Sequence, residues 1–184
     1  MQHQTLLITG VTGFLGGHMT LEALRQGHTV RGTLRSMKRA ESVREMLASH
    51  LGEAAEGALD RLTFHEADLL SPAGWREAAA GCDAALHVAS PFPMAAPKDE
   101  QEIISPARKG LKHVFDACAA EGVNRFVQTS STVAIVYGHG REQTAFTEQD
   151  LTQLDGGMSS AYIKRKTLAE QDLWLMAKKQ PKKP

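Results

Sequence analysis

A glycine-rich string, TGVTGFLGG at residues 9–17, constrains the fold of this chain more than any other feature. It closes a short apolar run that begins at Thr5, and a helical pattern follows it. Gly10, Gly13 and Gly16 suit a chain that turns sharply off a strand, approaches a pyrophosphate closely and packs a helix tightly on a sheet. The helix N-terminus would present unpaired N–H groups and a positive dipole end to phosphates. A glycine triplet alone is weak, but this strand–turn–helix setting favours dinucleotide binding over an ordinary turn.

Strand and helix patterns alternate along the rest of the chain. Strands are expected at residues 5–9, 28–34, 62–65, 83–89 and 125–130. Helices are expected up to about residue 26 and at about 39–51, 72–79, 100–121 and 159–178, with 138–157 as a loop. Ser71 is the expected N-cap of the third helix, with Pro72 in its first turn, and Gly122 ends the fourth. Alternating strands and helices predict an α/β fold with a doubly wound parallel sheet in the order 3-2-1-4-5.

The length of 184 residues fits one domain, or one with a fragment. We expect a nucleotide-binding domain over residues 1–178 and a basic, proline-containing tail over 179–184 that frays. Lys plus Arg and Asp plus Glu both number 21, which argues against a dedicated nucleic-acid or membrane-surface protein. Cys82 and Cys118 form no metal-type spacing, so neither a disulfide scaffold nor a metal site is expected. With no apolar run of membrane-span length and no visible signal peptide, we expect a cytoplasmic protein.

The end of the second strand indicates which dinucleotide is bound. An NAD enzyme usually carries Asp or Glu there for the ribose hydroxyls. This chain has Arg35, Lys38 and Arg39 instead, and no acid before Glu41. Arginine suits bidentate contact with a phosphate, so we expect NADP(H), with Arg35 as the best candidate for the 2′-phosphate. The alternative is a solvated basic turn that leads into a helix.

Tyr162 and Lys166 lie four residues apart in the last helix, which places both on one face. A carbonyl that is being reduced gains negative charge on oxygen and needs a proton. A neighbouring ammonium favours the ionised form of a phenol and so helps it to exchange protons near neutral pH. Ser130 and Ser131 close the fifth strand, where a hydroxyl could hold a substrate carbonyl or cap the strand end. The Tyr–Lys spacing alone is common, but after a glycine loop and five α/β units it favours a proton-transfer pair.

Together these features resemble the short-chain dehydrogenase/reductase superfamily, in its extended branch, the NAD-dependent epimerase/dehydratase proteins. Several strings narrow the resemblance to the dihydroflavonol reductase group. They are Asp68-Leu69, His87-Val88-Ala89-Ser90-Pro91-Phe92, Thr129-Ser130-Ser131 and Lys166-Thr167-Leu168-Ala169-Glu170. The resemblance covers residues 5–178 and implies a Rossmann-type sheet, an oxidoreductase acting on CH–OH groups and a small carbonyl or alcohol substrate.

The resemblance also implies roles for individual residues. Tyr162 is the implied proton donor, Lys166 assists it and binds the nicotinamide ribose, and Ser131 orients the carbonyl. Phe14 and Leu15 are expected to give backbone and packing contacts only. The implied cofactor-binding residues are Gly10, Thr12, Gly13, Phe14, Leu15, Gly16, Arg35, Lys38, Asp68, Leu69, Val88, Ala89, Ser90, Thr129, Tyr162 and Lys166.

The chain departs from the family in length and at two positions. Family members run to roughly twice this length, so we expect most of the usual C-terminal substrate domain to be missing. Arg165 stands where relatives often have Ser, and His113 stands at an Asn position. The shortened sheet would expose the edge at the fifth strand, which a homodimer could cover.

The sequence is compatible with three functions. The first is an NADPH-dependent reductase of ketones or aldehydes, and the second is a truncated NADP-binding module without turnover. The third is an NAD-dependent sugar-nucleotide epimerase or dehydratase, which Arg35 argues against. The sequence names no substrate.

Overall fold

The computed structural model describes residues 2–91, 99–140, 142–157 and 160–180. Two expectations fall outside these residues, namely Phe92 of the fourth-strand string and positions 181–184 of the tail. The chain divides into two compact units. The first comprises Met1–Ser90 with His113–Thr129, and the second comprises Pro91–Lys112 with Ser130–Pro184.

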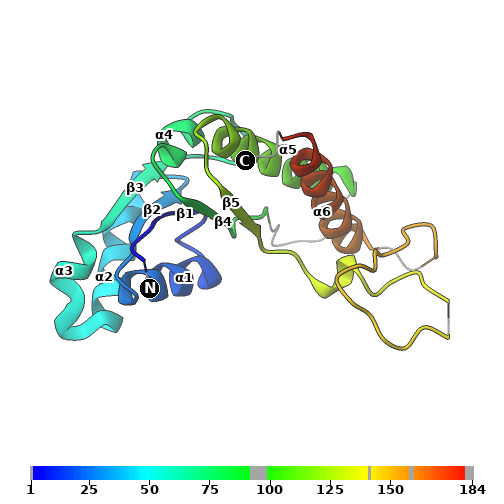
Figure 1. The fold of residues 1–184 in the computed structure, drawn as a ribbon, viewed down its shortest axis with the longest axis horizontal. Helices are drawn as coiled ribbons and strands as arrows, with labels where there is room; N and C mark the ends of the chain where they lie inside the picture. The colour runs from blue at the N-terminus through cyan, green and yellow to red at the C-terminus, as the bar shows by residue number, and fades with distance from the viewer. Residues whose placement is uncertain (1, 92–98, 141, 158–159, 181–184) are drawn as a thin grey trace. The chain divides into compact units, whose positions relative to one another are not determined.

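The first unit holds a parallel sheet of five strands in the order β3-β2-β1-β4-β5, which confirms the predicted order (Figure 1). The strands are β1 (Thr5–Ile8), β2 (Thr29–Leu34), β3 (Leu62–Glu66), β4 (Ala84–His87) and β5 (Arg125–Gln128). The helices of this unit are α1 (Phe14–Arg25), α2 (Ala40–Leu51), α3 (Ala55–Leu59), α4 (Trp75–Ala79) and the later part of α5 (Gln101–Ala120). Two 3-10 turns, η1 (Met37–Arg39) and η2 (Gly52–Ala54), precede α2 and α3.

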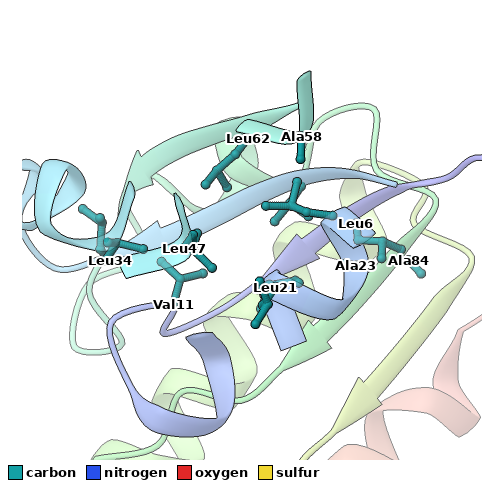
Figure 2. Close-up of a cluster of buried hydrophobic side chains, with 13 residues drawn as sticks. Leu6, Val11, Leu21, Ala23, Leu34, Leu47, Ala58, Leu62 and Ala84 are labelled. Carbon is teal, nitrogen blue, oxygen red and sulfur yellow. The ribbon is translucent and has the colours of Figure 1, made fainter. Parts of the chain in front are cut away.

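Alternating side chains of the strands feed two separate cores, because successive residues of a strand point to opposite faces. Leu6 and Ile8 pack against α1, α2 and α3, in the cluster drawn in Figure 2. Leu7, between them, packs on the other face with Trp75 of α4 and Val114 of α5. Helices therefore cover both faces of the sheet, as a doubly wound fold requires.

The boundaries of several elements differ from the predicted ones. The α4 helix does not begin at Pro72 with Ser71 as its N-cap. It begins at Trp75 after Gly74, which takes a left-handed φ of 82°. An alanine at Gly74 would place its Cβ 2.3 Å from the Glu66 carbonyl oxygen. Close backbone approach thus sets the start of α4, and Ser71 instead accepts a hydrogen bond from the Ala73 amide at 3.2 Å.

Other boundaries moved by a few residues. Strands β1, β4 and β5 end before Thr9, Val88 and Thr129, so each is slightly shorter than predicted. The short α3 helix was not predicted, because its five residues are too few for a helical period to be visible. Gly122 ends α5 as predicted, with a φ of 74°.

The second unit contains the first part of α5, the 3-10 turn η3 (Thr132–Ala134), a long loop and α6 (Ala161–Lys179). The described residues of the predicted loop, 138–140 and 142–157, contain no helix or strand, as expected. Thr152 ties this loop to η3, since its hydroxyl donates to the Val133 carbonyl at 2.7 Å and accepts from the Tyr137 amide at 3.0 Å.

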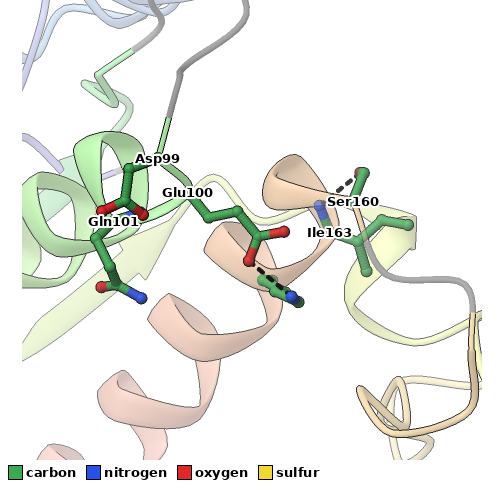
Figure 3. A network of polar contacts seen from close by, with 6 residues as sticks. Asp99, Glu100, Gln101, Ser160 and Ile163 are labelled. Carbon is green, nitrogen blue, oxygen red and sulfur yellow. Dashed lines mark hydrogen bonds and ion pairs between the residues drawn. The ribbon is translucent and has the colours of Figure 1, made fainter.

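Side chains cap the first turns of α5 and α6 in the second unit (Figure 3). Asp99 Oδ1 accepts from the Gln101 amide at 2.9 Å, and Ser160 Oγ accepts from the Ile163 amide at 3.3 Å. Glu100, the residue before α5, forms an ion pair with Lys164 of α6 at 2.6 Å. Among the described residues, no helix is both long and apolar enough to cross a membrane.

Candidate functional site

The glycine loop after β1 has the geometry that its sequence predicts. Gly10 takes a left-handed φ of 72°, which L side chains rarely adopt, and a Cβ there would lie 3.1 Å from the Cβ of Ala89. The Gly10 carbonyl accepts from the Gly13 amide at 3.0 Å, which closes the turn. A Cβ on Gly16 would lie 2.2 Å from the same Gly10 oxygen. The loop therefore needs glycine at 10 for its backbone conformation and at 16 for the close approach of α1.

The N-terminus of α1, which follows this loop, is exposed to solvent. Gly13 is the N-cap, and among the described residues no side chain caps the helix and no acid occupies its first turn. Phe14 is 83% exposed and Leu15 is 40% exposed, and Thr12 is also exposed. An uncapped helix start with its amides open suits an anion. The described ring contact of Phe14 is with His18 of the next helical turn, and its backbone and packing role at the cofactor stays a prediction.

A buried hydroxyl joins the glycine loop to the segment after β4. Thr9 is fully buried, and its Oγ1 accepts from the amides of Val88 at 3.0 Å and Ala89 at 2.9 Å. Both lone pairs of the hydroxyl are then occupied, so its own hydrogen goes to Nδ1 of His87, at 3.0 Å. That donation requires the His87 ring hydrogen to be on Nε2. The sequence singled out Val88 and Ala89, but it gave no role to the Thr9–His87 pair that holds them.

The basic turn after β2 is also present. Arg35, Lys38 and Arg39 are exposed, and no hydrogen bond or ion pair joins their side chains to any described residue. Their guanidinium and ammonium groups are therefore available to a phosphate.

An acid that sequence reasoning missed lies beside this turn. Glu66 ends β3, pairs in register with Leu34 of β2, and accepts from the Met37 amide at 2.9 Å. The prediction considered only acids that follow β2 in the sequence, whereas Glu66 lies at the end of the neighbouring strand β3. Its carboxylate holds the start of η1, next to the cations.

The remaining predicted residues of the first unit also lie after strand ends. Asp68 and Leu69 follow β3, where Asp68 Oδ1 accepts from the Leu70 amide at 2.9 Å and His113 Nδ1 donates to the Leu69 carbonyl at 3.0 Å. Ser90 is exposed after β4, and the Thr129 amide after β5 donates to the His87 carbonyl at 3.0 Å. The structure thus gathers the predicted cofactor residues of this unit at the carboxyl ends of its strands. In such sheets that edge is where ligands bind.

In the second unit, α6 carries Tyr162 and Lys166 one turn apart, as predicted. Tyr162 is 37% exposed, and the Arg165 guanidinium carbon lies 4.9 Å from the centre of its ring. Arg165 itself is 2% exposed and donates to the Pro91 carbonyl. The replacement of the usual Ser by Arg at this position thus adds a buried cation beside the tyrosine.

Ser130 and Ser131 have different hydrogen-bond partners. Ser130 contacts α6 twice, because its Oγ donates to Glu170 Oε2 and its carbonyl accepts from Lys166 Nζ at 3.4 Å. Ser131 is the N-cap of η3, and its Oγ accepts from the Val133 amide at 3.4 Å. Ser131 thus caps the turn that follows the strand and not the strand end itself, and as an acceptor in this bond its hydroxyl can still donate its hydrogen to a substrate oxygen.

Burial lowers the pKa of Lys166 from its ordinary value, and the nearby charge of Arg165 lowers it further. The Glu170 carboxylate opposes both effects and raises this pKa. Glu170 belonged to a sequence string of the resemblance, but its contacts with Ser130 and its charge at Lys166 appear only in the folded chain.

Comparison with known proteins gives the family of the chain. Residues 6–182 match the model of the NAD dependent epimerase/dehydratase family. Cinnamoyl-CoA reductase 1 of Petunia hybrida is 34% identical over 181 residues, which cover 95% of this chain and 50% of that protein. Dihydroflavonol 4-reductase of Arabidopsis thaliana is 32% identical over 179 residues, covering 94% and 45%. The chain spans about half the length of these relatives.

Solved structures show the same fold. Vestitone reductase from alfalfa superimposes with a TM-score of 0.76 and 27% identity, over 96% of this chain and 53% of that one. The yeast methylglyoxal/isovaleraldehyde reductase, solved with NADPH, gives a TM-score of 0.77 at 22% identity, over 95% and 53%. Together with the strand order and the matched residues, these similarities confirm the resemblance to dihydroflavonol reductases, and the chain belongs to the NAD dependent epimerase/dehydratase family.

Proposed function

We propose that this chain is the NADP(H)-binding and proton-transfer part of a reductase that converts a ketone or aldehyde to an alcohol. The observation that carries the proposal is the arrangement on α6, where Tyr162 and Lys166 share one face and Lys166 lies 3.4 Å from the Ser130 carbonyl. The same chain provides a dinucleotide loop with the required glycines. The relatives named above are reductases, which favours this chemistry.

The first unit would hold the cofactor. A Cβ at Gly10 or Gly16 would fill space next to the loop, and the uncapped start of α1 suits the pyrophosphate. Arg35, with Lys38 beside it, would bind the 2′-phosphate and select NADPH over NADH. Asp68 and Leu69 would border the adenine. The bound dinucleotide would supply the hydride.

The second unit would handle the proton. Tyr162 would donate its phenolic proton to the oxygen of the substrate as negative charge develops there. Lys166, held as an ammonium, would stabilise the phenolate that remains and bind the nicotinamide ribose. Ser131, through its hydroxyl hydrogen, would orient the carbonyl oxygen.

Three substitutions test these roles against the parent chain. Tyr162→Phe keeps the ring but removes the proton donor, so NADPH-dependent turnover should fall by about 10²–10⁴-fold with NADPH affinity nearly unchanged. Lys166→Ala should weaken both turnover and NADPH binding, whereas Ser131→Ala should reduce turnover alone. Turnover would be followed as NADPH oxidation with a panel of aldehydes and ketones, and affinity by fluorescence titration. Parental activity in Tyr162→Phe would refute the mechanism.

A second candidate is an NADP-binding module without turnover. It is favoured by the first unit, which carries the glycine loop and the basic turn after β2 without any residue of α6. The same titrations separate the two functions, since the module predicts NADPH binding with no oxidation by any substrate of the panel.

A further inference from the structure

Four side chains of α6 recur at a spacing of four residues, namely Tyr162, Lys166, Glu170 and Trp174. This spacing places them along one face of the helix. The proposed function uses the first two. The third, Glu170, is a carboxylate on the same face whose contacts the proposed chemistry leaves unexplained.

Each oxygen of Glu170 has a donor of its own. Oε2 accepts from the hydroxyl of Ser130, and Oε1 accepts from Nε1 of Trp174 at 3.5 Å. The first of these bonds crosses from α6 to the segment that follows β5, forty residues earlier in the chain. The carboxylate is therefore held by two hydrogen bonds, and it does not swing freely in solvent.

Ser130 is in turn fixed at two points of α6. Its hydroxyl binds Glu170 and its carbonyl faces Lys166 Nζ at 3.4 Å. The next residue, Ser131, begins η3 and caps it. The position of the Ser131 hydroxyl relative to α6 thus depends on how Ser130 is held.

The charge of Glu170 acts on Lys166 against two other effects. Arg165, the adjacent residue, is a second cation, and Lys166 is itself half-buried. Both conditions disfavour an ammonium, and Glu170 is the acid that acts against them. Lys166 can stabilise a phenolate only while its side-chain amine is protonated.

We propose that Glu170 is a positioning residue of the proton-transfer site, which anchors Ser130 to α6 and places a negative charge one helical turn from Lys166. The inference rests on the proposed function for its purpose, but the effect of Glu170 on Lys166 is measurable without turnover. It assigns Glu170 no contact with substrate or cofactor.

The test measures the titration of Lys166 in the folded chain by competitive labelling with acetic anhydride, read by mass spectrometry of the Lys166 peptide. Glu170→Gln keeps the size and an acceptor for Ser130 but removes the charge, so the Lys166 titration midpoint should move to lower pH. Asp172→Asn is the matched control. It removes one negative charge from the same helix, where Asp172 pairs with Arg108 at 2.5 Å, and it should leave the midpoint near that of the parent.

A third variant, Glu170→Asp, provides the test if Glu170→Gln does not fold. Glu170→Asp keeps the charge but shortens the reach to Ser130, so its midpoint should lie between those of the parent and Glu170→Gln. Should Glu170→Gln fail to fold, a midpoint of Glu170→Asp below the parent value supports the proposal. A midpoint at or above the parent value in whichever of these variants folds overturns it.

The outcome is separable from that of the proposed function. A shifted Lys166 midpoint in a chain without reductase activity would uphold the Glu170 inference and count against the reductase. Turnover that depends on Tyr162, combined with an unshifted midpoint in Glu170→Gln, would uphold the reductase and refute the inference.

Discussion

Substitution of Gly16 by alanine separates the close packing of the glycine loop from ordinary helix propensity. Gly16 lies in α1, where an alanine would by itself favour the helix by about 1 kcal/mol. The added Cβ, however, would lie 2.2 Å from the Gly10 oxygen and 2.8 Å from the Gly10 carbonyl carbon. Both are backbone atoms, so no side-chain rotation relieves the overlap.

The magnitude follows from these two opposing effects. Overpacking of a tight interface costs about 1–3 kcal/mol, and a backbone overlap belongs at the upper end of that range. Subtracting the gain in helix propensity leaves a net loss of about 2 kcal/mol in the free energy of unfolding. For a chain of this size, the melting temperature should fall by roughly 4–8 °C. Because the loop must shift, stabilisation by saturating NADPH should also decrease.

Two other glycines provide controls. Gly57 lies inside α3, and no described atom would come within 4 Å of its added Cβ, so Gly57→Ala should gain about 0.5–1 kcal/mol. Gly17→Ala would meet the flexible tip of Met46 at 3.1 Å and the Val11 carbonyl oxygen at an ordinary contact distance of 3.6 Å, and should be nearly neutral. Thermal unfolding followed by circular dichroism measures all three. A Gly16→Ala protein as stable as Gly57→Ala would refute the packing argument.

Three further predictions concern other parts of the chain. Arg35→Asp should reverse or abolish a preference for NADPH over NADH of about 1–3 kcal/mol, and equal affinities in the parent, by fluorescence titration, would sink the phosphate assignment. Thr9→Val should lower the free energy of unfolding by about 3 kcal/mol, because the amides of Val88 and Ala89, which follow β4, lose their buried acceptor. Thr9→Ser keeps the hydroxyl and should retain most of the stability. Urea denaturation compares the two variants, and equal stabilities would contradict the role of these hydrogen bonds. Burial raises the pKa of the Cys82 thiol to about 11 and that of Cys118 to about 12, so both are protonated at pH 8 and should react with a disulfide reagent only on unfolding. Fast labelling of the native chain would contradict their burial.

The predicted fold agrees with the structure wherever the pattern was local and repeated. The glycine loop, the alternation of strands and helices and the strand order could all be read from residues that are neighbours in sequence. Element boundaries were less accurate. Gly74, not Ser71, sets the start of α4, because the Glu66 backbone passes too close for any side chain at position 74.

The sequence by itself determined the candidate residues for dinucleotide binding and proton exchange, since glycine conformation, cation content and helical spacing are properties of the local chain. Only the tertiary structure decided what holds these residues in place. Thr9 meets the amides of Val88 and Ala89 across nearly eighty positions, and Glu170 meets Ser130 across forty. Such contacts arise when the sheet and the helices pack, and a buried polar group then takes whichever partner the packing brings near it. A single sequence carries no local signal for that choice.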